Sequence, residues 1–170
     1  MSVEKFSAIF DGLKLAYGTY KIEKQQANGK QAGRAAIVRE PRTTELWEGH
    51  LSGKGRSVGI IPINEDNMSV WGCIDVDQYP LDHKVLVEKI RKLKLPLVVC
   101  RSKSGGAHCF LFTTDWVDAK DMQSTLQQIS AALGYGGCEI FPKQIKLHLD
   151  RNDVGNFLNL PYYDAEEGLR

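Results

Sequence analysis

The chain of 170 residues carries 22 basic and 21 acidic side chains, a formal net charge of +1 that favours no class of partner. Its length supports one hydrophobic core with a small accessory layer, and its composition, 42% hydrophobic and 25% charged, is that of a soluble globular protein. No apolar run reaches the ~20 residues that span a membrane, and the first residues lack the apolar core of a secretion signal. We therefore expect one compact cytoplasmic unit with no membrane partner.

Residues 1–57 predict a small N-terminal accessory α/β part. Apolar side chains at helical spacing indicate a short helix at 3–12, and the polar composition of 17–33 predicts an exposed loop. A strand at 35–39 and a helix at 43–50 are expected to follow.

Two cations lie among glycines directly before the next apolar strand. Lys54 and Arg56 alternate with Gly53 and Gly55, so exposed amides and cations could together approach a phosphate. An ordinary surface turn explains the same pattern, because short glycine motifs are weakly specific. Lys54 and Arg56 are therefore candidate nucleic-acid contacts beside the plainer interpretation.

Residues 58–170 predict an α+β core with the order βαββαβ, the RRM-like or ferredoxin-like motif. Right-handed crossovers place its first and third strands in the middle of one sheet, with the fourth strand beside the first. The expected elements are a strand at 58–63, a tight connection at 64–67, and then the motif itself: a strand at 69–77, a helix at 83–94, strands at 97–101 and 107–113, a helix at 119–133 and a strand at 138–141.

Two carboxylates lie two positions apart inside an apolar strand. Asp75 and Asp77 share one face because side chains alternate along a strand, whereas Ile74 and Val76 face the core. Ionised carboxylates are rarely placed in this way unless a cation or a hydrogen-bond network offsets their repulsion. The pair therefore predicts a metal site in a cleft.

The expected strand order brings further polar residues to the same face. His108 would lie on one neighbouring strand and Glu139 on the other, on the face opposite the helices. Asp75, Asp77 and Glu139 together supply hard oxygen ligands that suit Mg²⁺ or Mn²⁺. Cys73 has the same parity and is expected to line the site, without a chemical role.

A turn rich in serine and glycine precedes the strand that carries His108. Consecutive amides in such a bend can form an anion-binding nest, and its serine and lysine side chains can donate to a triphosphate. His108 is either a phosphate or sugar contact or a satisfied structural histidine. The candidate nucleotide-binding residues of this segment are Ser102, Lys103, Ser104, Gly105, Gly106 and His108.

Four segments occur in the order that a known family shows. The strand WGCIDVD, the loop and strand SKSGGAHCFLF, the segment EIFPKQ and the segment GNFLNLPYY together resemble the catalytic core of archaeo-eukaryotic primases, especially the primase-polymerases of phages and other mobile elements. The resemblance covers about residues 46–163. It maps the first family motif onto Asp75 and Asp77, the second onto Ser104 and His108, and the third acidic position onto Glu139.

The resemblance implies a DNA primase or primase-polymerase that performs two-metal nucleotidyl transfer from nucleoside triphosphates on single-stranded DNA. It implies that Lys143 contacts triphosphate or template and that Asn159 lines the same pocket. Lys146 and Arg151 continue a basic stretch that could follow a nucleic-acid backbone, although a solvated loop explains it equally well. Family members often continue into further structure and a helicase, so this chain would be an excised core with a helicase as a possible partner.

Two other functions fit parts of the pattern. A non-catalytic RRM-like module would bind nucleic acid by stacking bases on Phe110, Phe112 and Phe141, which explains the sheet but not the three acids. A palm-type nucleotide cyclase would share the sheet and the acids but need no template. A rolling-circle nickase fits less well, because the segment HCFLF offers only one histidine.

Overall fold

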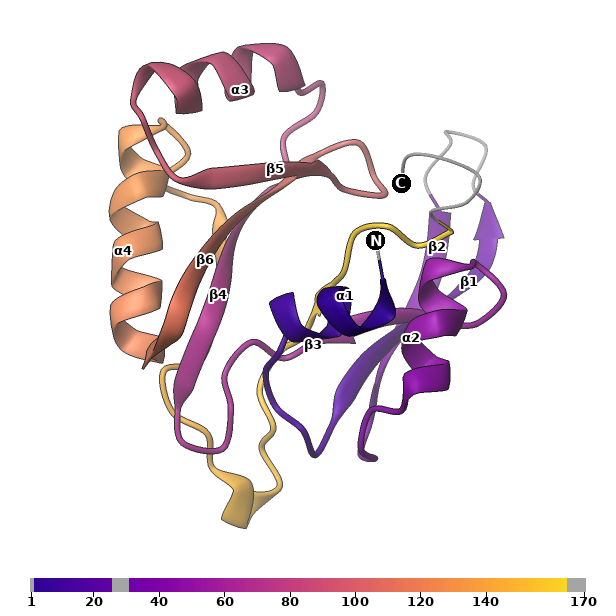
Figure 1. Cartoon of the computed structure of the whole chain (residues 1–170). Coiled ribbons are helices and arrows are strands. Elements are labelled where there is room, and N and C mark those ends of the chain that lie inside the picture. The colour runs from indigo at the N-terminus through magenta and orange to yellow at the C-terminus, as the bar shows by residue number, and fades with distance from the viewer. Residues whose placement is uncertain (1, 26–30, 165–170) are drawn as a thin grey trace.

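The computed structural model describes residues 2–25 and 31–164, which form two antiparallel four-stranded sheets and four α-helices (Figure 1). In that part of the chain, no helix is long and apolar enough to cross a membrane. The first sheet has the order β2-β1-β3-β8, and the second has the order β5-β6-β4-β7. The α+β class predicted from the sequence is confirmed.

The second sheet contains the expected βαββαβ motif. Its central strands are the first and third of the motif, and the fourth strand pairs with the first. Its elements are β4 (Met68–Val76), α3 (His83–Lys92), β5 (Leu97–Arg101), β6 (Ala107–Asp118), α4 (Ala119–Ala132) and β7 (Glu139–Phe141).

The remaining elements, most of them from residues 3–60, build a layer on the other face of that sheet, which we call the N-terminal layer. The first sheet lies with α1 and α2 across from α3 and α4, so the second sheet is covered on both faces over much of its length (Figure 1). The elements of this layer are α1 (Val3–Ile9), β1 (Tyr17–Gln25), β2 (Gln31–Val38), α2 (Thr44–Leu51), β3 (Ser57–Ile60) and β8 (Leu158–Asn159), with a short 3₁₀ helix, η1 (Leu149–Arg151), before β8.

Strand parity divides the apolar residues of β4 and β6 between two cores. Ile74, Val76 and Cys109 pack against α3 and α4, as the alternation predicts. Trp71 and Phe110 point the other way and are fully buried against α1, α2 and the first sheet. The second sheet is therefore largely an internal layer, and its polar side chains lie near the end of β4 that carries Asp75.

The prediction of an exposed loop at 17–33 is wrong. The described part of this segment forms β1 and β2, which pair along most of their length, and residues 26–30 lie outside the described residues. The polar composition did not indicate a strand, because the strand conformation of β1 depends on long-range pairing rather than on local propensity. Gly18 and Tyr20 pair with Gly59 and Ser57 of β3.

The strand and connection expected at 58–67 lead to a different sheet rather than to a hairpin. β3 pairs with β1 and β8, whereas β4 pairs with β6 and β7. The connection is held by Asn64, whose side-chain oxygen accepts hydrogen bonds from the amides of Asp66 and Met68. A division of the chain between residues 57 and 58 remains a proposal; in space, β3 and β8 complete the sheet that β1 and β2 begin.

His50 is fully buried in the N-terminal layer, where its ring makes hydrogen bonds to two other segments of the chain. Its Nδ1 accepts a hydrogen bond of 2.9 Å from the Val58 amide, so the ring proton lies on Nε2, which is 2.9 Å from the carbonyl oxygen of Pro161. Burial lowers the pKa of His50, and the Pro161 contact only partly opposes that shift. The neutral ring thus joins α2 to β3 and to the chain that follows β8.

Acid should therefore reduce the stability advantage of His50 over an uncharged replacement. Because the folded-state pKa lies below the unfolded value of about 6.5, the unfolded chain gains the proton first, and stability falls as the pH drops below that value. The wild type should exceed His50→Gln in free energy of unfolding near neutral pH, and the difference should shrink towards pH ~5. Urea unfolding of both proteins measures it, and a difference independent of pH would contradict a buried neutral ring.

Candidate active site

The register of the second sheet brings four polar side chains to one face. Asp75 of β4 is the direct partner of His108 on β6 and of Glu139 on β7, and opposed residues of antiparallel strands share a face. Asp77 follows two residues later, just past the end of β4. The parity inferred from the sequence thus describes the arrangement in the structure.

The three acids line one pocket of about 310 Å³. Asp77 and Glu139 are exposed, whereas the Asp75 side chain is only 20% exposed. The pocket lies where β4 ends beside the turn between α4 and β7. Its other lining residues are Gln78, Gly134, Tyr135, Gly137 and Cys138.

The electrostatics of this pocket favour a cation. Burial, and then repulsion from Asp77 and Glu139, raise the pKa of Asp75 to about 6, against the opposing effect of Lys143. His108 does not neutralise the acids: its Nε2 lies 3.5 Å from Asp75 Oδ1, but burial lowers the pKa of His108 to about 4, so the ring is neutral at pH 7. The contact is therefore not an ion pair.

The donor set suits a hard divalent cation in its chemistry, but it is not gathered into one cage. Among residues 2–25 and 31–164, no three His, Cys, Asp or Glu side chains lie close enough to hold a metal. Glu139 Oε2 is 2.7 Å from Lys143 Nζ, so this carboxylate is paired with a cation of its own. Asp75 and Asp77 are the candidate ligands as they stand, and Glu139 could join them once Lys143 releases it.

The turn at residues 102–106 lies directly beside this face. The Ser102 amide donates to the Gly106 carbonyl and the Gly105 amide donates to the Ser102 carbonyl, so neither amide is free for an anion. Gly105 has a φ of +95°, and a Cβ on Gly106 would lie 2.3 Å from the Val76 carbonyl oxygen. Both glycines are thus required by the turn and by its close packing against the end of β4.

Lys103 connects this turn to the N-terminal layer. Its Nζ lies 2.8 Å from the centroid of the Tyr20 ring on β1, and burial lowers the pKa of Lys103 to about 8. The cation expected to meet a triphosphate is therefore partly desolvated and held between the two sheets.

Tyr79 is a site residue that the sequence reasoning missed. Its hydroxyl is 2.6 Å from Asp77 Oδ1 and 2.6 Å from Ser104 Oγ, and Ser104 Oγ lies 3.3 Å from Ser102 Oγ. A run of hydrogen bonds therefore joins the turn to the acidic pocket. The only signal in the sequence was the position of Tyr79 two residues beyond Asp77, the same spacing that separates the two aspartates.

Several predicted contacts are not brought to the pocket. The Leu147 amide donates to the side chain of Asn67, next to the start of β4, so Lys146 and Arg151 lie at the end of that strand far from Asp75. Lys54 and Arg56 are exposed in the turn between α2 and β3. Asn159 lies in β8, pairs with Gly59, and has a buried side-chain oxygen with no hydrogen-bond partner among the described residues.

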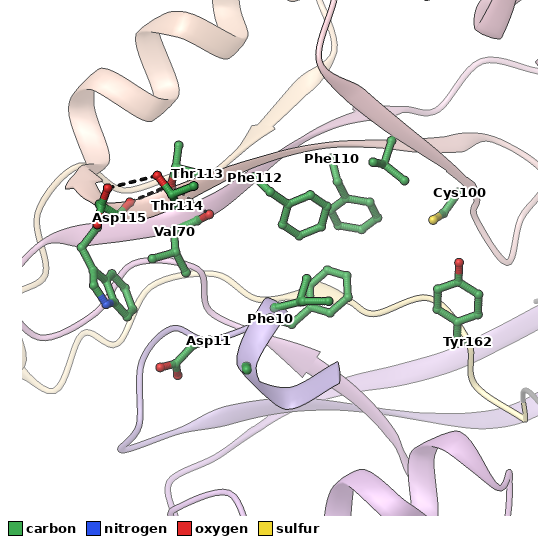
Figure 2. Close-up of a pocket in the computed structure, with 14 residues that line it drawn as sticks. Phe10, Asp11, Val70, Cys100, Phe110, Phe112, Thr113, Thr114, Asp115 and Tyr162 are labelled. Carbon is green, nitrogen blue, oxygen red and sulfur yellow. Dashed lines mark hydrogen bonds between the residues drawn. The ribbon is translucent and has the colours of Figure 1, made fainter. Parts of the chain in front are cut away.

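Cys73 and the aromatic residues of the sheet belong to the core. Cys73, expected to line the site, is fully buried because the N-terminal layer covers that part of β4. Phe110 is 0% exposed and Phe141 is 4% exposed, so the stacking surface of the RRM-like alternative is not available. The two residues Phe110 and Phe112 line a cleft of about 720 Å³. Figure 2 shows their rings facing Phe10, which directly follows α1, with Tyr162 near the Cys100 end of the cleft.

A comparison with models of protein families identifies the family to which the chain belongs. The sheet is of the ferredoxin-like βαββαβ class, and a family model described as the archaeo-eukaryotic primase domain of TOTE conflict systems matches residues 14–167. The chain therefore belongs to the archaeo-eukaryotic primase family, whose members are generally nucleotidyltransferases, and the resemblance seen in the sequence is confirmed. A search of curated proteins found no match.

Proposed function

We propose that this chain is the catalytic domain of a DNA primase or primase-polymerase, which makes or extends primers from nucleoside triphosphates on single-stranded DNA. The observation that carries the proposal is the pocket lined by Asp75, Asp77 and Glu139 beside a serine-glycine turn. Membership of the archaeo-eukaryotic primase family supports the same reaction class and the same ligands, nucleic acid and nucleoside triphosphates.

In this proposal, the acidic residues bind the cations and the lysines bind the triphosphate. A bound Mg²⁺ or Mn²⁺ pair would neutralise triphosphate charge and activate the attacking hydroxyl. Asp75 and Asp77 would bind the cations, and release of Glu139 would free Lys143 for a phosphate. Lys103 would meet the triphosphate from the turn, where partial desolvation strengthens its attraction for an anion.

Neutral His108 can donate one hydrogen bond without adding charge. Its ring is held edge-on against Phe110, with 5.8 Å between the ring centroids, so its orientation is fixed by the core. We assign it to a phosphate or sugar oxygen of the nucleotide. Lys54, Arg56, Lys146 and Arg151 are proposed as weaker contacts to template away from the pocket.

Incubation with Mn²⁺ or Mg²⁺, nucleoside triphosphates and single-stranded DNA tests the proposal. We expect products longer than one nucleotide whose sequence follows the template and which disappear when the template or the metal is omitted. A primed template should be included, so that extension can be seen without initiation. Absence of product from both primed and unprimed templates would refute the proposal.

A palm-type cyclase remains the second candidate, because it would use the same acids. It predicts a cyclic mononucleotide made equally well without DNA, which the template-free reaction of the same assay would reveal. The covered aromatic face speaks against the binding-module alternative, since Phe110 and Phe141 cannot stack on bases where they lie.

A further inference from the structure

The Tyr79 hydroxyl joins two parts of the site that the chain brings from different strands. Asp77 follows β4, and Ser104 lies in the turn between β5 and β6. The two hydrogen bonds of 2.6 Å place both groups on one phenol oxygen. Tyr79 is 54% exposed, so its ring makes little contribution to the core and its contacts belong to the site.

The direction of these bonds follows from the protons available. An ionised carboxylate only accepts, so the phenol proton goes to Asp77, and the Ser104 hydroxyl must then donate to the Tyr79 oxygen. The Ser104 proton is thereby committed and is not offered to a phosphate. This distinguishes Ser104 from Lys103, whose ammonium group is the anion-binding group of the turn.

We propose that Tyr79 and Ser104 form a tether that fixes the triphosphate turn relative to the metal carboxylate Asp77, and that Ser104 serves as the tether's anchor rather than as a phosphate ligand. The inference rests on the proposed function. Tyr79 is a positioning residue in this scheme: its bond fixes one oxygen of Asp77 and leaves the other for a cation, and it holds the turn at a set distance from that cation.

A tether and a direct phosphate contact predict different losses of nucleotide binding when Tyr79 and Ser104 are both replaced. Tyr79→Phe and Ser104→Ala each break the same link, so each should weaken metal-nucleotide binding by about tenfold, the effect of one hydrogen bond to a charged group. The double variant should bind no more weakly than either single variant, because the link can be broken only once. If Ser104 instead bound a phosphate, its loss would add to the loss of Tyr79.

Binding rather than turnover is the readout. A fluorescent nucleoside triphosphate titrated in Mn²⁺ gives the dissociation constant of the wild type, both single variants and the double variant. Calorimetric Mn²⁺ titration without nucleotide reports on the metal carboxylates, Asp77 among them, separately from the turn. Tyr79→Phe should also weaken Mn²⁺ binding, whereas Ser104→Ala should weaken it less. Melting temperatures should not change, because Tyr79 is exposed.

Tyr162→Phe is the matched control. Tyr162 is also exposed, at 41%, and its hydroxyl has no hydrogen bond within the described part of the chain, so this variant should bind as the wild type does. Wild-type or tighter binding by Tyr79→Phe, or additive losses in the double variant, would overturn the tether while the proposed function stands. A wild type that binds no nucleotide would overturn both.

Discussion

Replacing Asp75 with asparagine should abolish metal-dependent nucleotidyl transfer and, at neutral pH, stabilise the metal-free protein. Loss of transfer follows because Asp75 lies between Asp77 and Glu139 in the acidic pocket. A reduction of ~10²–10³-fold or more is expected when a group that organises transition-state charge is removed. Gain of stability follows because the same charge is unfavourable in the folded chain.

The sign of the stability change follows from the pKa of Asp75. The folded-state pKa is about 6 and the ordinary value is 3.8, so the fold disfavours the charged carboxylate. That penalty is fully present above pH ~6 and absent below pH ~4, and a shift of this size corresponds to about 1–3 kcal/mol. Asp75→Asn should thus be more stable than the wild type near pH 7, with the gain disappearing in acid.

Urea unfolding at several pH values, with and without Mn²⁺, measures this prediction. Mn²⁺ should stabilise the wild type and have little effect on Asp75→Asn, because the cation binds the folded carboxylate. Asp150→Asn is the control, since this carboxylate is exposed and lies in η1, away from the pocket. An Asp75→Asn protein that is less stable than the wild type at neutral pH would contradict the account of the pocket as a repulsive acidic cluster.

Replacing Phe110 with alanine should destabilise the whole protein rather than only weaken nucleic-acid binding. The ring is fully buried between β6 and the N-terminal layer, within 5.3 Å of the Phe10 ring and 5.9 Å of the Trp71 ring, centroid to centroid. Truncating a buried phenylalanine costs about 3–5 kcal/mol of unfolding free energy, from lost burial and the cavity left behind.

Thermal or urea unfolding of Phe110→Ala measures that loss. Val98→Ala is the control, because Val98 lines the same cleft but is 52% exposed, so it should cost far less. A Phe110→Ala protein with wild-type stability and specifically weakened DNA binding would favour the RRM-like alternative and contradict the covered sheet.

The second sheet could be predicted from the sequence because its signals are local. Ile74 and Val76 alternate with Asp75 and Asp77, and the apolar stripes of α3 and α4 are clear, so strand order and parity followed from general rules of chain connection. The placement of His108 and Glu139 beside Asp75 then needed no further information.

The helices expected at 3–12 and 43–50 are α1 and α2 of the N-terminal layer, but the sheet of this layer could not be predicted, because it depends on contacts distant in sequence. β1 is polar and becomes a strand through pairing with β3, and β8 joins that sheet from the far end of the chain. The burial of the stacking face could not be predicted for the same reason, since Phe110 is covered by residues of the N-terminal layer such as Phe10. Tyr79 was missed because its role depends on where Ser104 lies in space.

A crystal structure of the protein with Mn²⁺ and a non-hydrolysable nucleoside triphosphate tests the central claim most directly. The anomalous signal of manganese should lie between Asp75 and Asp77, with Glu139 turned away from Lys143 and the triphosphate against Lys103. Manganese bound elsewhere would contradict the assignment of this pocket as the nucleotidyl-transfer site. A nucleotide bound in the cleft between Phe10 and the second sheet, with the acidic pocket empty, would contradict it as well.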